Sequence, residues 1–190
     1  MQSRDMLEND LEPGEEIQKL PDKGYKQILN FKRMGRELAM QYLFQCDIAN
    51  ESEKQETLES FWEQAEESGA FTVKRTFQRA QNYALKLIYG VQQNLSEIDD
   101  LMQGVSSQWN LNRMSVVDRN IMRVAIYELK YCPDIPVAVC IDEAIEIAKD
   151  FSDQNSGMFI NGLLNAIKIK LYPDMEKTKK RQSDVEKQKD

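Results

Sequence analysis

Two short stretches of the sequence gather side chains whose types suit the binding of a ligand. Lys32, Arg33 and Arg36 fall within about one helical turn of the segment FKRMGRELAMQYLF, so their charges can converge on one anion. Phe151 and Phe159 border the small polar residues of the segment KDFSDQNSGMF, where two rings can hold a flat group by stacking. Each segment also has a plainer interpretation: a solvated basic face in the first, and a helix connection with core aromatics in the second.

The sequence lacks most of the side chains that catalysis uses. It contains no histidine, and therefore lacks the usual general base and the Ser–His pair. Its three cysteines, Cys46, Cys132 and Cys140, form no C-x-x-C pair and lie among apolar residues, so we expect reduced, buried thiols. No glycine-rich phosphate loop and no G-x-S-x-G motif is present. We therefore expect a binding protein without a metal site rather than an enzyme.

Charge and hydropathy limit the partners further. The chain of 190 residues has a formal net charge of −7, which argues against a surface that binds polyanions everywhere. A small local basic patch remains compatible with this charge. No apolar run approaches the roughly 18 residues that a membrane span needs, and the N-terminus does not resemble a signal peptide. We expect a cytoplasmic protein that does not enter a membrane.

Apolar residues repeat with a helical period through nearly all of the chain between residues 32 and 172. The acidic residues 1–31 and the charged residues 173–190 show no such period, and we expect them to be flexible. The sequence therefore predicts an all-α protein of about seven helices. They span about 32–48, 53–67 and 72–93, a short stretch from Leu95 to Val105, a segment ending near Tyr131, and segments that start at Pro136 and near Ser156.

Capping signals and one glycine refine the helix ends and the packing. Ser115 and Asp118 resemble an S-x-x-[DE] capping box at the start of the fifth helix. We expect Ser156 or a polar neighbour to cap the last helix. Gly162 lies inside that helix, where glycine costs about 1 kcal/mol relative to alanine. We therefore expect another helix to approach closely at Gly162.

Periodicity leaves two pairs of residues with more than one interpretation. Phe159 is turned about 100° from its stripe neighbour Ile160, so it has either a second packing surface or a ligand. Phe151 can extend the core face of the preceding helix or face outward. Arg119 and Arg123 repeat at i, i+4, which fits either ion pairing on a helix surface or a charged protein-binding surface.

Three stretches of the sequence resemble, in order and spacing, the NusB family of transcription antitermination factors. The resemblance implies an all-helical fold of two packed subdomains, here about 32–105 and 106–172. It also implies binding of the boxA element of single-stranded nascent RNA together with NusE, a small-subunit ribosomal protein. The complex would join RNA polymerase and suppress termination, notably in ribosomal RNA operons, with no enzymatic activity and no cofactor. The stretches are RELAMQYLFQ (36–45), WNLNRMSVVDRNIMRVAIYEL (109–129) and IPVAVCIDEAIEIAKDFSDQNSGMFINGLLNAI (135–167).

The resemblance assigns RNA-binding roles to residues of the first helix. Lys32, Arg33 and Arg36 occupy the family's arginine-rich segment, where Met34 and Gly35 dilute the charge. We expect this thinning to lower the electrostatic contribution to RNA affinity and its dependence on salt. A further ring of the same motif, usually tyrosine in the family, is Phe44 here.

The resemblance also assigns roles to the loop before the last helix and to the partner surface. Phe151 and Phe159 match the family's RNA-facing aromatics, and Asn155 replaces an acidic residue between them. We expect the amide to remove a repulsion toward phosphate. For NusE, the resemblance favours the surface around Asp118 and Arg119.

Other interpretations remain compatible with the sequence. A domain like this one also occurs in front of ribosomal RNA cytosine methyltransferases, and residues 173–190 are too few for a cofactor-binding domain. In that setting the chain would supply only RNA recognition. A purely structural helical interaction module is a third class, and the apolar surface that receives NusE could instead pair two copies in a homodimer.

Overall fold

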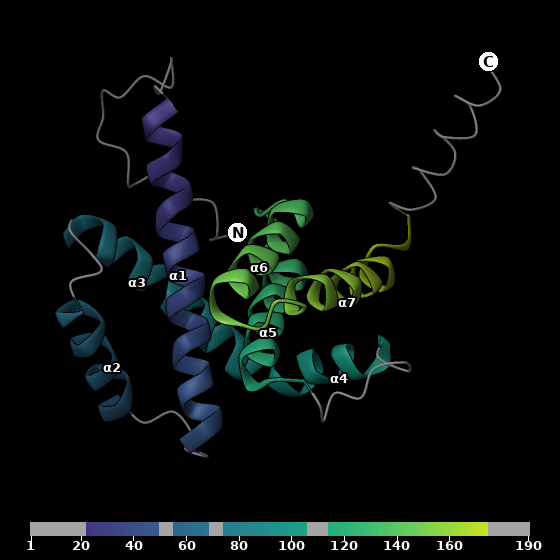
Figure 1. The fold of residues 1–190 in the computed structure, drawn as a ribbon, viewed down its shortest axis with the longest axis horizontal. Helices are drawn as coiled ribbons and strands as arrows, with labels where there is room; N and C mark the ends of the chain where they lie inside the picture. The colour runs from purple at the N-terminus through teal and green to yellow at the C-terminus, as the bar shows by residue number, and fades with distance from the viewer. Residues whose placement is uncertain (1–21, 50–54, 69–73, 106–113, 175–190) are drawn as a thin grey trace, which may run out of the picture. The chain divides into compact units, whose positions relative to one another are not determined.

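The computed structural model describes residues 22–49, 55–68, 74–105 and 114–174, with side chains from Phe31 in the first range and from Leu58 in the second. Those ranges contain helices and no strand, which confirms the all-α prediction (Figure 1). Residues Met1–Asn30 and Phe31–Asp190 are two separate units, and the second contains all the predicted site residues. The helices are α1 (Asp22–Ala49), α2 (Gln55–Glu67), α3 (Lys74–Gln93), α4 (Leu95–Val105), α5 (Val116–Tyr131), α6 (Val137–Phe151) and α7 (Ser156–Leu171).

The helix boundaries agree with the predicted ones except at the start of α1. That helix begins at Asp22, so residues 22–31, for which the sequence predicts flexibility, are helical. The predicted flexibility of residues 1–21 and 175–190 lies outside the described residues. The break at Cys132–Pro136 is present, because proline ends the helical pattern, and Pro136 is the N-cap residue of α6.

Helix α5 forms the centre of the second unit. It contacts α3, α4, α6 and α7, and Figure 1 shows α5, α6 and α7 stacked together. The serine half of the predicted capping box is present at its N-terminus, because the Ser115 Oγ accepts a hydrogen bond from the Asp118 backbone N–H at 3.0 Å. The Asp118 carboxylate binds Ser152 and Ser156 instead. Apolar side chains are buried along α5 on several faces, which is the pattern of a helix surrounded by others. They are Ile121, Met122, Val124, Ala125, Ile126 and Leu129.

Close helix approach occurs at two glycines, but not at the predicted one. A Cβ on Gly35 of α1 would lie 2.8 Å from a ring carbon of Tyr83 in α3, and one on Gly90 of α3 would overlap the ring of Tyr127 in α5. A Cβ on Gly162 would meet nothing within 4 Å. The prediction that Gly162 allows close packing is therefore wrong, since this residue lies on the exposed face of α7.

The same substitution is expected to have opposite effects at two of these glycines. Gly162→Ala should stabilise the fold by roughly 0.5–1 kcal/mol, because alanine reduces the entropy of the unfolded chain and meets no neighbour. Gly90→Ala should destabilise it by about 1–3 kcal/mol, because the new methyl group overlaps the Tyr127 ring. Urea midpoints measure both changes, and a lower midpoint for Gly162→Ala would contradict the open environment of that residue.

Candidate nucleic-acid interface

The loop between α6 and α7 carries the predicted aromatic rings. After Phe151 the backbone of Ser152 is extended, and a turn follows in which the Ser156 N–H donates to the Asp153 carbonyl at 2.9 Å. Helix α7 then begins with Asn155 as its N-cap residue, whose side chain makes no capping hydrogen bond. The prediction that Ser156 or a polar neighbour caps α7 is wrong, because the Ser156 hydroxyl is used elsewhere.

A buried carboxylate of α5 holds this loop in place. The hydroxyl of Ser152 donates to Asp118 Oδ1 at 2.7 Å, and that of Ser156 donates to Asp118 Oδ2 at 3.0 Å. The two hydroxyl oxygens are also 3.0 Å apart. Asp118 is only 6% exposed, so its carboxylate faces the loop from inside the protein. The Asp118 side chain is therefore enclosed and already hydrogen-bonded within the protein. Its contribution to a NusE-binding surface stays a prediction.

The anchored loop presents rings and polar groups of different exposure. Phe151 is 40% exposed, and Asn155 is also exposed. Phe159 is half-buried and packs against the core, while its neighbour Ile160 is fully buried, so Phe159 does lie off the stripe as predicted. Met158 is 77% exposed beside them and was not singled out from the sequence. Its exposure follows only from the helix orientation, because methionine is ordinarily a core residue.

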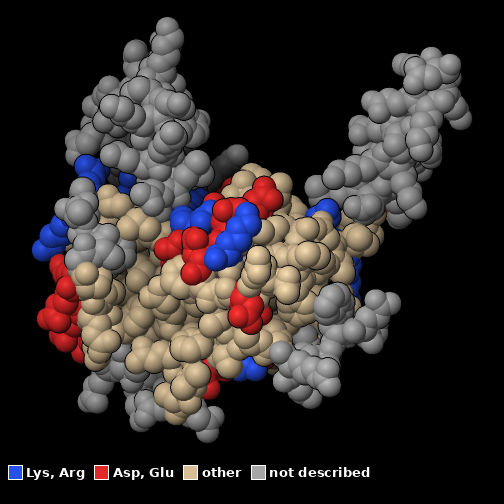
Figure 2. Space-filling view, in the orientation of Figure 1, with Lys and Arg blue, Asp and Glu red and all other residues tan. Residues whose placement is uncertain are grey.

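Two of the three predicted cations of α1 converge on a carboxylate of the protein itself. Arg33 Nε lies 2.6 Å and Arg36 Nη1 lies 3.0 Å from Glu143 Oε2 on α6. The hydrogen bond from Arg33 to Glu143, partly opposed by burial, raises the pKa of Arg33 above its ordinary value. Figure 2 shows basic and acidic atoms intermixed near the centre of one face, over α6. Lys32 is half-buried and is the one member of the predicted trio outside this cluster of ion pairs among the described residues.

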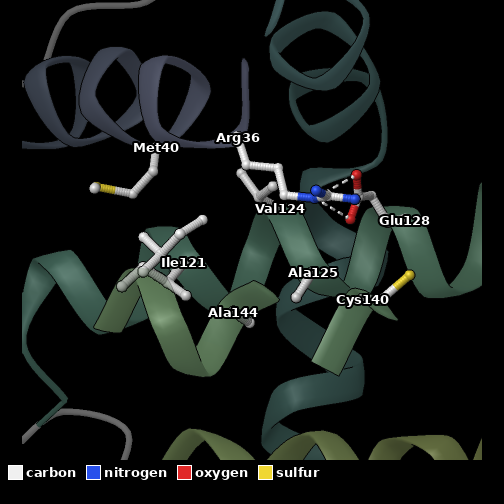
Figure 3. A pocket seen from close by; sticks show the side chains of 9 residues that line it. Arg36, Met40, Ile121, Val124, Ala125, Glu128, Cys140 and Ala144 are labelled. Carbon is white, nitrogen blue, oxygen red and sulfur yellow. Dashed lines mark hydrogen bonds and ion pairs between the residues drawn. The ribbon is translucent and has the colours of Figure 1, made fainter. Parts of the chain in front are cut away.

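Arg36 lies inside the protein rather than on its surface. It is 3% exposed, and its Nε lies 2.9 and 3.0 Å from the two carboxylate oxygens of Glu128 in α5 (Figure 3). Burial acts to lower the pKa of Arg36, but the charge and hydrogen bond of Glu128 outweigh it and raise the pKa. The Tyr83 hydroxyl of α3 donates to the same carboxylate. The expected convergence of three cations on one external anion is therefore wrong for Arg36, because Glu128 and Glu143 already hold it.

A small cavity beside this pair offers no room for a ligand. It lies between α1, α5 and α6, and apolar side chains form most of its wall (Figure 3). Its volume of about 10 Å³ is at the lower limit for one water molecule. Its lining residues are Arg36, Met40, Ile121, Val124, Ala125, Glu128, Cys140, Ala144 and Ile147.

The cysteines of the described region are free and show no sign of reactivity. Cys132 and Cys140 are each 1% exposed, as predicted, while Cys46 is half-buried. Burial and the charge of Glu128 raise the pKa of the Cys140 thiol to about 12, so the nucleophilic thiolate is not populated near neutral pH. Among the residues that the structure describes, no group of three or more His, Cys, Asp or Glu side chains is placed to hold a metal ion.

Arg119 belongs to a second network, which ties α1 and α4 to α5. Its Nη2 lies 2.8 Å from Asp47 Oδ2, and Arg123 Nη1 lies 2.9 Å from the same oxygen. Arg123 also binds Asp99 of α4 at 2.8 Å. Burial acts to raise the pKa of Asp47, but the hydrogen bond from Arg119 and the charge of Arg123 outweigh it and lower the pKa. The side chain of Arg119 remains 33% exposed, so it is partly accessible.

Two further features complete the placement of the predicted residues. Phe44 is half-buried on α1, so part of its ring is accessible. Within the ranges that the structure describes, no helix is both long enough and apolar enough to cross a membrane.

Removal of Arg36 is expected to destabilise the fold rather than only the surface. Arg36→Met leaves the carboxylate of Glu128 buried without its counter-charge, which typically costs about 3–5 kcal/mol. The double variant Arg36→Met/Glu128→Leu should recover much of this loss, because both charges are gone. Urea unfolding measures both effects. A stable Arg36→Met protein would contradict the buried position of this residue.

Removal of Asp118 is expected to free the loop between α6 and α7. Asp118→Ala leaves the buried hydroxyl of Ser156 and the half-buried one of Ser152 without their acceptor. The loss should cost about 1–3 kcal/mol and should speed hydrogen exchange selectively at residues 152–156. Ser115→Ala is the matched control, because it removes only the cap of the same helix at a cost of about 1 kcal/mol. Equal exchange in the loop of both variants would show that Asp118 does not anchor it.

Comparison with known proteins gives the chain its family. Residues 33–168 match the NusB family model. The chain is 45% identical over 140 residues to the transcription antitermination protein NusB of Myxococcus xanthus, covering 74% of this chain and 96% of that protein. It is 42% identical over 137 residues to NusB of Bacillus cereus strain B4264, covering 72% of this chain and 96% of that protein.

Solved structures give the same result. One of T. maritima NusB aligns with a TM-score of 0.59 and 39% identity, covering 72% of this chain and 89% of that one. A crystal structure of the antitermination factors NusB and NusE in complex with dsRNA aligns with a TM-score of 0.59 and 25% identity, covering 73% and 96%. The seven described helices, their order and the match over residues 33–168 therefore lead to one conclusion: this chain belongs to the NusB family.

Proposed function

We propose that this protein is a non-enzymatic transcription antitermination factor that acts in the cytoplasm. It binds a boxA-type single-stranded RNA together with the ribosomal protein NusE, and the complex joins RNA polymerase and suppresses termination, notably in ribosomal RNA operons. The observation that carries the proposal is the family match over residues 33–168, which includes α5, α6 and the anchored loop. A relative of the family has been solved with NusE and dsRNA, which supports NusE and RNA as partners here.

The loop between α6 and α7 is the best-supported part of the proposed RNA surface. Phe151 is exposed, Phe159 has a partly accessible ring, and Asn155 lies exposed between them. Stacking on an aromatic side chain contributes roughly 1–3 kcal/mol per base and suits single-stranded RNA, whose bases are free to splay out. The Asp118 anchor fixes the loop before RNA arrives, so binding does not have to order it.

The basic start of α1 contributes less charge than the sequence suggests. Lys32 and the half-buried Arg33 remain candidates for phosphate contacts, and Phe44 for a further ring contact. Arg33 has to share its guanidinium with Glu143, and Arg36 acts indirectly by holding that carboxylate from the inside. We therefore expect a modest salt dependence from this segment.

We place the NusE surface at the first turns of α5. Arg119 is partly exposed there, and Asp118 beneath it contributes by fixing the neighbouring loop. The two residues lie on the helix that also anchors the proposed RNA loop. Binding of NusE at this helix would therefore bring the second protein close to the RNA.

Loss of either ring is expected to weaken RNA binding. Phe151→Ala and Phe159→Ala should each lower the affinity for a boxA-like strand about 5- to 150-fold, the equivalent of stacking on one base. Asn155→Asp should also weaken binding, because a carboxylate repels phosphate. Fluorescence anisotropy with labelled RNA, with and without NusE, measures all three.

The matched control for the charge change is Gln64→Glu. It adds the same single negative charge on an exposed residue of α2, which belongs to neither proposed RNA surface. Unchanged affinity in both ring variants would refute the assigned site while leaving the family intact. Absence of RNA binding by the parent protein, even with NusE present, would refute the proposed function.

A further inference from the structure

Helix α3 carries four cations and no carboxylate, in a protein whose formal net charge is −7. The whole chain holds 32 acidic and 25 basic residues, yet residues 68–96 contain no aspartate or glutamate. Within that segment α3 carries the cations Lys74, Arg75, Arg79 and Lys86, all exposed. A helix that is cationic without any carboxylate has no internal means to neutralise its own charge.

The exposed side chains of α3, apart from Lys74 at its start, form one continuous stripe. Arg75, Arg79 and Lys86 are spaced at i, i+4 and i+11, which places them on one face of a helix. The opposite face is buried and apolar, so the orientation of this stripe toward solvent is fixed by the core. Its members are cations, amides and one tyrosine: Arg75, Gln78, Arg79, Asn82, Lys86, Tyr89 and Gln93.

The stripe continues onto the basic start of α1 through two aromatic rings. The guanidinium carbon of Arg79 lies 4.4 Å from the centre of the Phe31 ring, and Lys32 Nζ lies 5.5 Å from the centre of the Tyr83 ring. The two rings meet edge to face at 6.4 Å. Gly35 permits this contact, because a side chain there would overlap Tyr83. Lys32 and Arg79 therefore flank one aromatic pair on neighbouring helices.

These cations also differ from those of α1 in what neutralises them. Glu143 binds Arg33, and Glu128 with Glu143 binds Arg36. Among the described residues, none of the ion pairs involves a side chain of α3. Figure 2 shows blue atoms at the margin beside the start of α3 and red atoms along α2, whose exposed glutamates bound the basic surface on that side.

We infer that the exposed stripe of α3, together with Lys32, is a second RNA-binding surface that holds the sugar-phosphate backbone beyond the bases at the α6–α7 loop. Cations and amides along a helix donate to phosphate and sugar oxygens without reading sequence, and Tyr89 offers one ring for stacking. The stripe holds no aliphatic side chain, so it lacks the apolar centre that a protein partner requires. This inference rests on the proposed function and extends it to flanking nucleotides.

The test compares a short boxA-like strand with the same strand extended on either side. The full-length protein should bind the extended strands more tightly than the short one. Arg75→Gln/Arg79→Gln should lose most of that gain, and the slope of log affinity against log salt should fall by about 0.7 for each phosphate that is no longer neutralised. The control Lys168→Gln/Lys170→Gln removes the same charge from the last turn of α7, which Figure 1 shows on the other side of α5, and should keep the gain.

The outcomes separate this inference from the proposed function. If Phe159→Ala weakens binding of the short strand while Arg75→Gln/Arg79→Gln binds every strand like the parent, the α3 surface is refuted and the proposed function stands. Loss of affinity for NusE alone in the α3 variant would identify a protein surface and also refute it. Failure of the parent to bind any strand would refute both. Equal urea midpoints for parent and variants establish that the fold is intact.

Discussion

The buried pair of Arg36 and Glu128 is the interaction on which the arrangement of the helices depends. It joins α1 to α5 inside the protein, and the same two side chains reach Glu143 of α6 and Tyr83 of α3. Charges at this depth are tolerated only when each one has a partner, because desolvation of an isolated ion costs several kcal/mol. The four helices therefore have to meet in one register, which a purely apolar core would specify less strictly.

This use of charge inside the protein changes what remains on its surface. The arginines of α1, whose spacing suits an external anion, are largely committed to Glu128 and Glu143. A group of cations without a carboxylate partner in the described region lies instead on α3. Their spacing alone does not mark them as a binding surface, because the sequence leaves open which face of this helix is exposed. Position relative to the core, rather than residue type, separates structural cations from accessible ones.

Helix α5 has a comparable double role at its N-terminus. Ser115 caps the helix through its hydroxyl, and the carboxylate of Asp118 holds Ser152 and Ser156 of the loop before α7. Arg119, the next residue, turns toward Asp47 of α1. One turn of helix thus connects the proposed RNA loop to the proposed partner surface, which gives the two binding events a common rigid support.

The sequence by itself determined the all-α class, most helix boundaries, the Ser115 cap and the off-stripe position of Phe159, because these depend on periodicity and on side chains within a few residues. The tertiary structure alone decided that Arg36 is buried, that Asp118 anchors a loop, that Gly162 is open and that Met158 is exposed. Each of these depends on contacts between helices distant in the sequence. A helical period defines one apolar face, but only packing shows which polar side chains that face encloses and which it leaves to solvent.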